Sequence, residues 1–527
     1  MKKDMPLLGA LICISLLVTF YCQHRGFVNP YLIHDDVNQY LPAVYALSPG
    51  PLHNALLEGD LIIKYMVLKD SPGHLYLLSL LSRFMPPLSL IRLLPFFLAA
   101  LSTICFFYLG KAMQNSTVGF FCALIFSFYL WTSGFGFLSG AFPKAFAFPL
   151  LLLFLIFLSA GKRALSLPVI LLQVLIFPAV ALISLAVYFL NLFRDGLPGK
   201  RELFAFGFCA LGFLLISTIL YRAGNDFLGS LVSFKEMASM PEFGPGGRDY
   251  LFTANISDFF TSEDASGIAV SRAFWVLVLF FLASSLYLER RFLRLPRLIV
   301  YVFFCGVVLF WCAWIFLFYL FFPGRYIEYT LPLFMITVIA LAIDRLLEKR
   351  GILAKRLMFS AATAAIILAY APFLQQNLKD YQRPYYEYLK TLPQDALVAA
   401  HPYEADPLPT FAQRRVLVQF EVSTAWYGNY YSRVKERTYD FFRAYYASSW
   451  KTIEGFFRKY GISCMIVNKG HFEQRYLKEG KFYLAPFNEY VRGIVRDNQG
   501  NFVLAGKERR GRTLYEDRDF YILSLKE

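Results

Sequence analysis

The sequence predicts a polytopic α-helical membrane protein with about eleven transmembrane helices, followed by an α/β domain outside the membrane. Hydrophobic residues make up 57% of the 527 residues and the mean hydropathy is +0.48, whereas soluble domains contain roughly 45–50% apolar residues. Apolar runs recur up to residue 374, and the remaining sequence is polar. We therefore divide the chain into a membrane module, residues 1–374, and a soluble external domain, residues 375–527.

The first apolar run, residues 7–21, follows Lys2 and Lys3. No small-residue cleavage site follows at residues 20–23, so we predict a retained signal-anchor helix rather than a cleaved signal peptide. A basic flank keeps the N-terminus in the cytoplasm. The polar stretch that follows, residues 22–92, is therefore expected to be an external loop.

Two other apolar runs are not expected to cross the membrane as single straight helices. Residues 167–193 are interrupted by Pro178, which predicts two short or broken helices that leave and return on the same face. Residues 75–84 are too short to cross and end at Met85-Pro86-Pro87, so an interfacial helix is expected there. The other expected spans are residues 93–110, 118–133, 145–160, 203–221, 274–288, 298–322, 331–343 and 357–374.

The distribution of positive charge supports this count. The net charge of +15 falls in short clusters between apolar runs rather than along one stripe, which disfavours a nucleic-acid partner. With the spans above, the basic linkers lie on one side, as the positive-inside rule requires. These linkers are residues 111, 161–163, 194–201, 290–297 and 345–356. Because no retention signal is evident, we expect a bacterial inner membrane with the C-terminal domain in the periplasm.

The C-terminal domain alternates strand-like and helical patterns. Strands are predicted at residues 397–400, 416–420, 462–467, 493–496, 502–505 and 521–525, and helices at residues 435–447 and 450–460. Its aromatic clusters, residues 426–431 and 441–446, are expected in the core. The sequence from His401 to Asp406 has metal-binding residue types, but its prolines and its place after a strand favour a loop.

Several classes of chemistry have no support in the sequence. Seven of the eight cysteines lie in or beside apolar spans and only Cys464 lies in the polar part, so neither a disulfide framework nor a zinc pattern is present. Phosphate-loop and dinucleotide glycine fingerprints are also missing, as are the serine-hydrolase and zinc-protease motifs. The external acidic pair Asp35-Asp36 and the external cations remain as candidates.

The order of the N-terminal features carries a family resemblance. A signal-anchor helix, a loop with Asp35-Asp36, the segment Ser71-Pro72-Gly73-His74 and a helix opened by Arg92-Leu93-Leu94 follow one another. This order resembles the GT-C superfamily of polyprenyl-phosphate-sugar-dependent glycosyltransferases, which includes protein O-mannosyltransferases and aminoarabinose transferases. The resemblance covers residues 1–374. It implies transfer of a sugar from a polyprenyl-phosphate-linked donor in the membrane to a glycan, lipid or protein acceptor.

Such a transfer needs a carboxylate that deprotonates the acceptor and cations that hold the departing phosphate. We expect Asp35 to be the general base. Asp36 is then its electrostatic partner, an acceptor ligand or a ligand of a divalent metal, because close carboxylates shift one another's proton affinity. Metal dependence stays open. The alternative is that the pair only caps a helix through residues 38–40.

Arg325 is the first candidate for the lipid phosphate. It lies in the short external turn of residues 323–329, and a guanidinium matches phosphate oxygens with paired donors. The alternative is an interfacial anchor, with Tyr326 in the aromatic belt and Glu328 neutralising the charge.

Lys144, His34 and His74 complete the candidate substrate-binding residues. Lys144 lies in the external segment 134–144, from which GT-C enzymes contribute to the active site, although some carry an acidic residue where this chain has Pro143-Lys144. The two histidines either contact phosphate or substrate or form local hydrogen bonds. The acidic residues Glu58, Asp60 and Asp70 of the first external loop are expected to be solvated.

Two other functional classes remain open. A lipid-linked polysaccharide ligase or polymerase has a similar number of spans, but relies on external Arg and His without an early carboxylate pair. A transporter or flippase places ionisable groups near the membrane midplane, whereas this chain keeps nearly all its charges at span ends.

Overall fold

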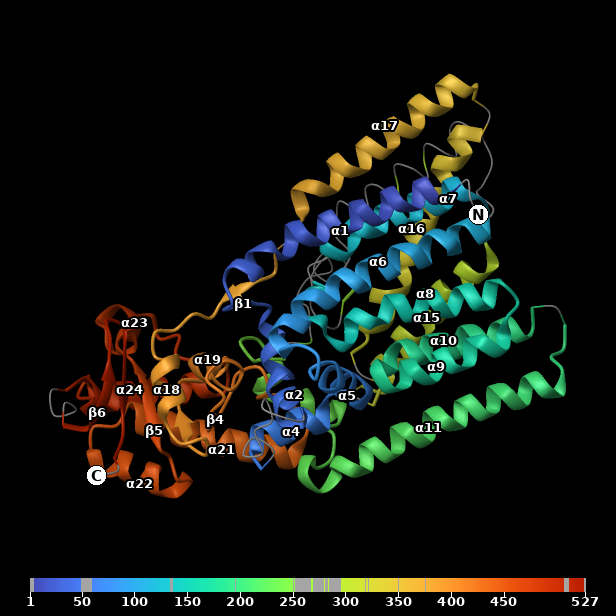
Figure 1. The fold of residues 1–527 in the computed structure, drawn as a ribbon. Coiled ribbons are helices and arrows are strands. Elements are labelled where there is room, and N and C mark those ends of the chain that lie inside the picture. The colour runs from blue at the N-terminus through green and yellow to red at the C-terminus, as the bar shows by residue number, and fades with distance from the viewer. Residues whose placement is uncertain are drawn as a thin grey trace.

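The computed structural model describes residues 4–48, 59–132, 136–194, 196–249, 251, 267–268, 279, 283, 295–317, 319–320, 322–348, 350–374, 376–506 and 511–525. A bundle of long helices lies at one end of the molecule, the C-terminal domain lies at the other, and short helices lie between them (Figure 1). Most of the predicted span at residues 274–288 and most of the basic linker 290–297 lie outside the described residues.

Helices occupy the other expected spans. Six of the described helices are long and apolar enough to cross a membrane, and four shorter apolar segments lie beside them, which indicates an integral multi-pass membrane protein. The six are α1 (Met5–Val28), α6 (Pro87–Met113), α11 (Lys200–Leu228), α15 (Arg297–Ile315), α16 (Gly324–Glu348) and α17 (Ile352–Tyr370). The shorter ones are α7 (Ser116–Thr132), η4 with α8 (Pro143–Phe146 and Ala147–Ser159), α9 (Arg163–Ile176) and α10 (Pro178–Leu192).

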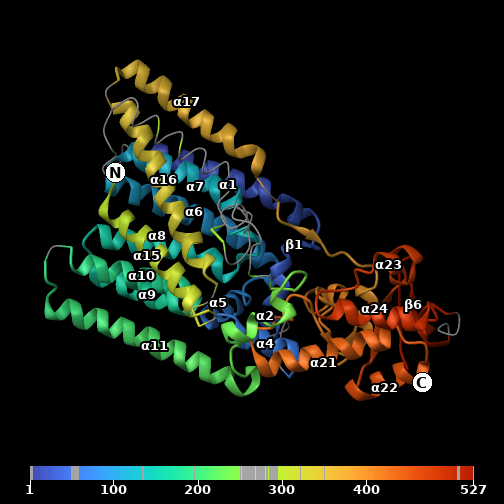
Figure 2. The same cartoon turned by 180° about the vertical axis from the view of Figure 1, so that it is seen from behind.

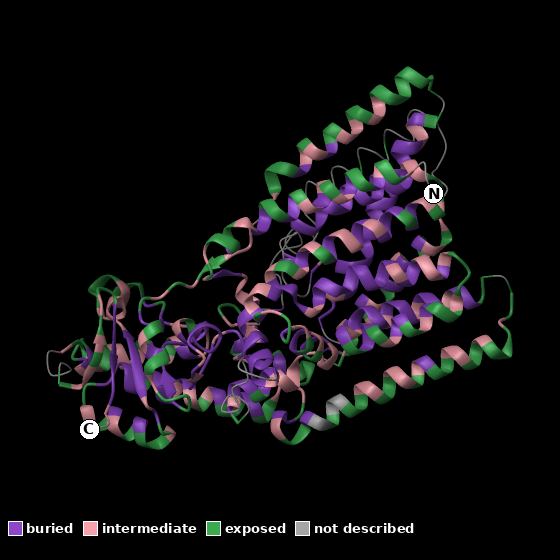
Figure 3. Ribbon diagram, in the orientation of Figure 1, coloured by how far each residue is buried: buried purple, intermediate pink, exposed green. Residues whose placement is uncertain are grey.

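The outer helices display large apolar side chains. Many positions on α11 and α17 are exposed (Figure 3). The exposed fractions reach 77% for Phe204, 63% for Phe208 and 74% for Leu368. Large contiguous apolar surfaces are rare on soluble monomers. In a bilayer these side chains contact lipid tails, while helix formation satisfies the backbone polar groups internally.

The helix interruption at Pro178 is confirmed. α9 ends at Ile176, Pro178 opens α10, and the two helices pack side by side. Proline suits the first turn of a helix because its missing N–H has no partner there in any case. The pair leaves and returns on the same face of the bundle, as the sequence predicted, and Arg163 at the start of α9 pairs with Glu202 near the start of α11.

Two glycines set the close packing of α6 on α7. A Cβ atom on Gly110 would lie 2.8 Å from the Cα of Gly119, and one on Gly119 would overlap the carbonyl oxygen of Phe107. Small residues allow membrane helices to approach closely, so this contact depends on both glycines.

We expect Gly119→Ala to lower the thermal unfolding temperature of the detergent-solubilised protein, because overpacking costs about 1–3 kcal/mol. The matched control is Gly9→Ala in α1, where a Cβ meets nothing within 4 Å. There the better helix propensity of alanine, up to ~1 kcal/mol, should leave stability unchanged or raise it. Equal shifts for the two variants would contradict the packing role of Gly119.

The described part of residues 22–92, which the sequence places outside the membrane, is more buried than the sequence suggested. It contains β1 (Leu32–Ile33), η2 (Asp35–Gln39), α2 (Leu41–Leu47), α4 (Leu61–Lys69) and α5 (Pro72–Leu81), and α5 covers most of the short helix expected at residues 75–84.

The expected solvation of the acidic residues in this loop is wrong for Asp60, which is only 5% exposed. Its Oδ1 accepts hydrogen bonds from the backbone N–H groups of Ile62 and Ile63, so it caps α4. Asp70 pairs with His74 at 3.1 Å, and Glu58 lies outside the described residues.

The C-terminal domain contains a mixed five-stranded sheet in the order β4-β3-β5-β7-β6. β4, β3 and β5 run parallel, whereas β7 and β6 add antiparallel strands at one side. The strands are β3 (Leu397–Ala399), β4 (Arg415–Val416), β5 (Cys464–Asn468), β6 (Thr513–Glu516) and β7 (Phe520–Leu523). Helices between them include α21 (Gly428–Tyr445) and α22 (Trp450–Tyr460), as predicted, and the α/β character is confirmed.

Two strand predictions in this domain are wrong. Residues 493–496 belong to α24 (Phe487–Asn498), whose apolar residues Phe487, Val491 and Ile494 recur at helical spacing. Residues 502–505 form a single helical turn, η8 (Val503–Ala505), although Phe502 and Leu504 are buried in the alternating way of a strand. The sequence analysis missed β6, an edge strand with partly exposed side chains. The described residues include all eight cysteines, and none forms a disulfide.

A short two-stranded sheet joins the first external loop to the segment that enters the C-terminal domain. β1 pairs antiparallel with β2 (Lys379–Asp380), with Leu32 opposite Asp380. The N-terminus and the described basic linkers lie at the opposite end of the bundle (Figures 1 and 2). There Asp4 accepts hydrogen bonds from Lys111 at 2.6 Å and from Ser116 at 2.7 Å.

This arrangement gives a direct test of topology. In intact cells we expect a membrane-impermeant maleimide to label Glu489→Cys in the C-terminal domain, because that side chain is 76% exposed on the predicted external side. The matched variant Leu197→Cys, at a residue 94% exposed between α10 and α11, should react only after the inner face is opened. The reverse pattern would place the Asp35-Asp36 loop in the cytoplasm.

Candidate functional site

The acidic pair lies at the junction between the helical bundle and the C-terminal domain. Asp35 and Asp36 open η2, directly after the buried strand β1. At the start of this turn, His34 Nδ1 lies 3.3 Å from the nitrogen of the Asp36 backbone N–H. Asp35 Oδ1 accepts the same N–H at 3.0 Å. Capping therefore uses one oxygen of Asp35 and neither oxygen of Asp36.

Both carboxylates are held in the ionised form. Burial favours a raised pKa for Asp35, but hydrogen bonding and charge from His34, 2.9 Å away, and from Lys379 lower it well below its usual range. Burial also opposes ionisation of Asp36, yet the charges of Lys144 and His34 lower the pKa of Asp36. A general base must be ionised before it can accept a proton, and both residues meet this condition.

Lys144 and Arg325 approach the pair from the membrane side. Lys144 is 9% exposed, and its Nζ lies 3.4 Å from Asp36 Oδ2 and 4.8 Å from the centre of the Phe142 ring. Arg325 begins α16, donates to Glu328 Oε2 at 3.3 Å and interacts electrostatically with Asp36. Glu328 interacts in turn with Lys144. The structure thus brings together cations that the sequence separates by 181 positions (325 − 144).

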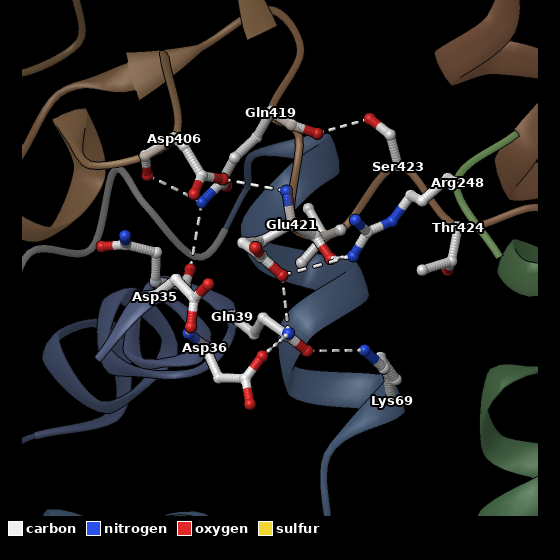
Figure 4. A network of polar contacts seen from close by, with 12 residues as sticks. Asp35, Asp36, Gln39, Lys69, Arg248, Asp406, Gln419, Glu421, Ser423 and Thr424 are labelled. Atoms are coloured by element: carbon white, nitrogen blue, oxygen red, sulfur yellow. Dashed lines mark hydrogen bonds and ion pairs between the residues drawn. The ribbon is translucent and has the colours of Figure 1, made fainter. Parts of the chain in front are cut away.

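On the side of the C-terminal domain, Gln39 links Asp36 to a second set of charged residues (Figure 4). Gln39 Nε2 donates to Asp36 Oδ1 at 2.7 Å and to Glu421 Oε2 at 2.8 Å. Lys69 Nζ donates to Gln39 Oε1 at 3.0 Å, and Arg248 donates to Glu421 Oε2 at 3.3 Å. No signal in the sequence points to Gln39, Lys69 or Glu421, because each lies in an ordinary local context.

The remaining sequence-predicted residues lie in different surroundings. His34 touches both carboxylates, at 2.9 and 3.9 Å. His74 is fully buried, and its ring nitrogens contact Asp70 Oδ2 at 3.1 Å and the Ala141 carbonyl at 2.9 Å. Tyr326 is 1% exposed and donates to the Leu320 carbonyl at 2.6 Å. These contacts of His74 and Tyr326 stabilise the fold. Contact of either residue with a substrate stays a prediction.

One cluster in the part of the chain that the structure describes offers metal-ligand atoms. Nδ1 of His34 and one carboxylate oxygen each of Asp35 and Asp36 lie within 4.8 Å of one another. Imidazole and carboxylate ligands suit zinc and related divalent ions. The donor types therefore fit a metal ion. Binding of the ion would displace Lys379 from Asp35 and Lys144 from Asp36.

Residues 401–406 do not add to this cluster. Pro402–Ala405 forms a short helix where a loop was expected, and His401 Nε2 contacts the Phe482 carbonyl at 3.0 Å. Asp406 accepts the backbone N–H of Glu421 at 2.9 Å. This acidic residue serves the junction rather than a metal site.

No protein-family model and no curated protein sequence matches the chain. Solved structures do match it. The Archaeoglobus fulgidus oligosaccharyltransferase in complex with zinc and sulfate aligns with a TM-score of 0.51 at 11% identity, over 91% of this chain and 70% of that one. The archaeal oligosaccharyltransferase AglB from A. fulgidus, in complex with an inhibitory peptide and a dolichol-phosphate, aligns with a TM-score of 0.52 at 12% identity, over 92% and 72%. The chain shares the oligosaccharyltransferase fold.

The sequence resemblance to GT-C glycosyltransferases covered residues 1–374. The similarity reaches further than the resemblance did, because it covers 91–92% of the chain and so includes the C-terminal domain. The matched structures are oligosaccharyltransferases, whereas the resemblance pointed to protein O-mannosyltransferases and aminoarabinose transferases. At 11–12% identity the similarity concerns the fold.

Proposed function

We propose that this protein is a membrane glycosyltransferase that transfers a sugar from a polyprenyl-phosphate-linked donor to a glycan, lipid or protein acceptor. The observation that carries the proposal is the position of the Asp36 carboxylate, 3.4 Å from Lys144 on the membrane side and linked through Gln39 to Glu421 of the C-terminal domain. The oligosaccharyltransferase fold supports it, and one matched structure holds a dolichol-phosphate.

We assign the role of general base to Asp36 and an electrostatic role to Asp35. Asp36 shares its surroundings with Lys144 and Arg325, whereas Asp35 is tied to Lys379, whose side chain is 64% exposed. This assignment reverses the expectation from sequence.

In the proposed reaction the acceptor hydroxyl gives its proton to Asp36 as its oxygen attacks the anomeric carbon. The bond from that carbon to the phosphate oxygen breaks, and Lys144 and Arg325 stabilise the negative charge that develops on the phosphate. Lys144 and Arg325 therefore form the proposed phosphate-binding part of the site.

A divalent metal forms an optional part of the proposal. His34, Asp35 and Asp36 would hold the ion, and when bound it would neutralise charge on the leaving phosphate. His74 and Tyr326 stay proposed substrate-site residues.

We further propose that residues 1–374 form the membrane module and residues 375–527 the external domain, in the periplasm of a bacterial cell. A polysaccharide ligase or polymerase is the second candidate, because it shares the external cations. The reaction of such a ligase or polymerase would not depend on Asp36. A flippase finds less support, since the carboxylates of the site lie at the junction rather than along the spans.

The proposal is tested by supplying purified protein in proteoliposomes with synthetic polyprenyl-phosphate sugars and mixed acceptors, with products detected by mass spectrometry. We expect a glycosylated acceptor and free polyprenyl phosphate from the wild-type protein only. Movement of intact donor between leaflets without cleavage would instead identify a flippase. Joining of whole polymers by an Asp36→Asn variant would identify a ligase.

A further inference from the structure

Gln39 lies between three charged side chains at the centre of the junction (Figure 4). The two hydrogens of its amide nitrogen serve two carboxylates, Asp36 at 2.7 Å and Glu421 at 2.8 Å. Its amide oxygen accepts from Lys69 at 3.0 Å. A rotated amide would turn its oxygen toward two carboxylates and its nitrogen toward an ammonium group. The charges around it therefore fix the orientation of Gln39.

This fixed amide also fixes Asp36. One oxygen of Asp36 receives the Gln39 amide, and the other faces Lys144 at 3.4 Å. The carboxylate is held at both oxygens and cannot rotate without losing one contact. The outer anchor of this arrangement is Glu421, which is 6% exposed and also accepts from Arg248.

The C-terminal domain holds Glu421 in place through its own backbone. The Glu421 N–H donates to Asp406 Oδ1 at 2.9 Å. The neighbouring Gln419 donates to the carbonyl oxygens of Asn38 at 3.0 Å and of Asp406 at 2.9 Å. Thr410 donates to the Asn38 side chain at 2.7 Å. The segment of residues 419–421 therefore hydrogen-bonds both the backbone of η2 and the side chain of Gln39.

We propose that Glu421, in the C-terminal domain, is a positioning residue that aligns Asp36 for proton transfer through Gln39. This inference rests on the proposed function and adds a role for the domain, which then completes the membrane site. The C-terminal domain then acts on Asp36 through one side chain, that of Gln39. A shift of about 1 Å in a reacting group can cost ~10²-fold in rate.

The test compares two substitutions of one residue in the proteoliposome assay. Glu421→Gln keeps an oxygen that can accept from Gln39, so we expect kcat to stay within about threefold of wild type. Glu421→Leu removes the acceptor, and we expect kcat to fall at least ~10-fold with the donor KM changed less than about twofold. Glu387→Leu, at an exposed acidic residue of the same domain, is the control and should match wild type. Equal kcat values for Glu421→Leu and wild type would overturn the proposal.

A double-mutant cycle separates positioning from simple support of Arg248. If Glu421 acts through Gln39, Glu421→Leu should add no further loss in kcat to a Gln39→Ala variant. A full additional loss in that background would show that Glu421 acts independently of Gln39, and would also overturn the proposal.

Hydrogen exchange measured by mass spectrometry provides a readout that needs no activity. We expect Glu421→Leu to speed exchange in residues 35–41, while Glu421→Gln and Glu387→Leu leave it unchanged. If the wild type shows no sugar transfer but exchange responds in this way, the proposed function fails and the positioning contact stands. Unchanged exchange in all variants would overturn the contact itself.

Discussion

Asp36→Asn is expected to abolish sugar transfer, with a loss of about 10²–10⁴ in kcat, because an amide cannot accept the acceptor proton. The substitution keeps the size of the side chain and an oxygen that can accept from Gln39, so the junction should remain assembled. Donor binding should change little, since the loss concerns a step in which the proton moves. The measurement is turnover in proteoliposomes, with thermal unfolding as the check on folding.

Two matched variants accompany this experiment. Asp35→Asn should reduce turnover less, because Asp35 acts on the charge of the site and is tied to Lys379. Asp380→Asn changes an exposed carboxylate in the neighbouring strand β2 and should behave as wild type. Near-normal transfer by both Asp35→Asn and Asp36→Asn would refute the catalytic assignment of the pair.

Arg325→Ala is expected to lose most activity, while Arg325→Lys retains part of it. A guanidinium offers paired donors to phosphate oxygens, whereas an ammonium acts as a point charge. The interaction strengthens as negative charge develops on the leaving phosphate, so kcat should fall together with donor affinity. Donor binding and single-turnover rates measure the two effects separately.

The control for this pair of variants is Arg297→Ala, which removes an exposed arginine at the start of α15. Removing Arg325 also leaves the buried Glu328 without its ion pair, so the unfolding temperature must be followed in parallel. If Arg325→Ala keeps both donor affinity and turnover, Arg325 only anchors the helix. Lys144 and the domain-side pair Lys69 and Arg248 then become the candidates for the phosphate.

The structure corrected two expectations from the sequence. Asp60 was expected to be solvated, as a charged residue in a loop usually is, yet it is buried and caps α4. Residues 493–496 have the β-branched character of a strand, but they continue an apolar helical face that begins at Phe487. Both features are local: the Asp60 cap acts over two and three residues, and the helical face of residues 487–498 shows its period only over a window longer than four residues.

Only some residues of the candidate site could be predicted from the sequence. The sequence pointed to Asp35, Asp36, Lys144 and Arg325 because they lie in segments expected outside the membrane, where a carboxylate can act as a base and cations can hold a phosphate. It gave no reason to choose Gln39 or Glu421, which are 382 residues apart and meet at a single hydrogen bond. It also favoured Asp35 as the base, whereas the proposal from the geometry is Asp36, which faces Lys144 and Gln39.

The sequence by itself determined the membrane class, the positions of most spans, the break at Pro178 and the presence of a C-terminal α/β domain. These properties follow from hydropathy and periodicity, which act over stretches of about 10–20 residues and are written into the local order of side chains. Only the tertiary structure decided which charges meet around Asp36, because ion pairs and hydrogen bonds act over a few ångströms between segments that folding brings together.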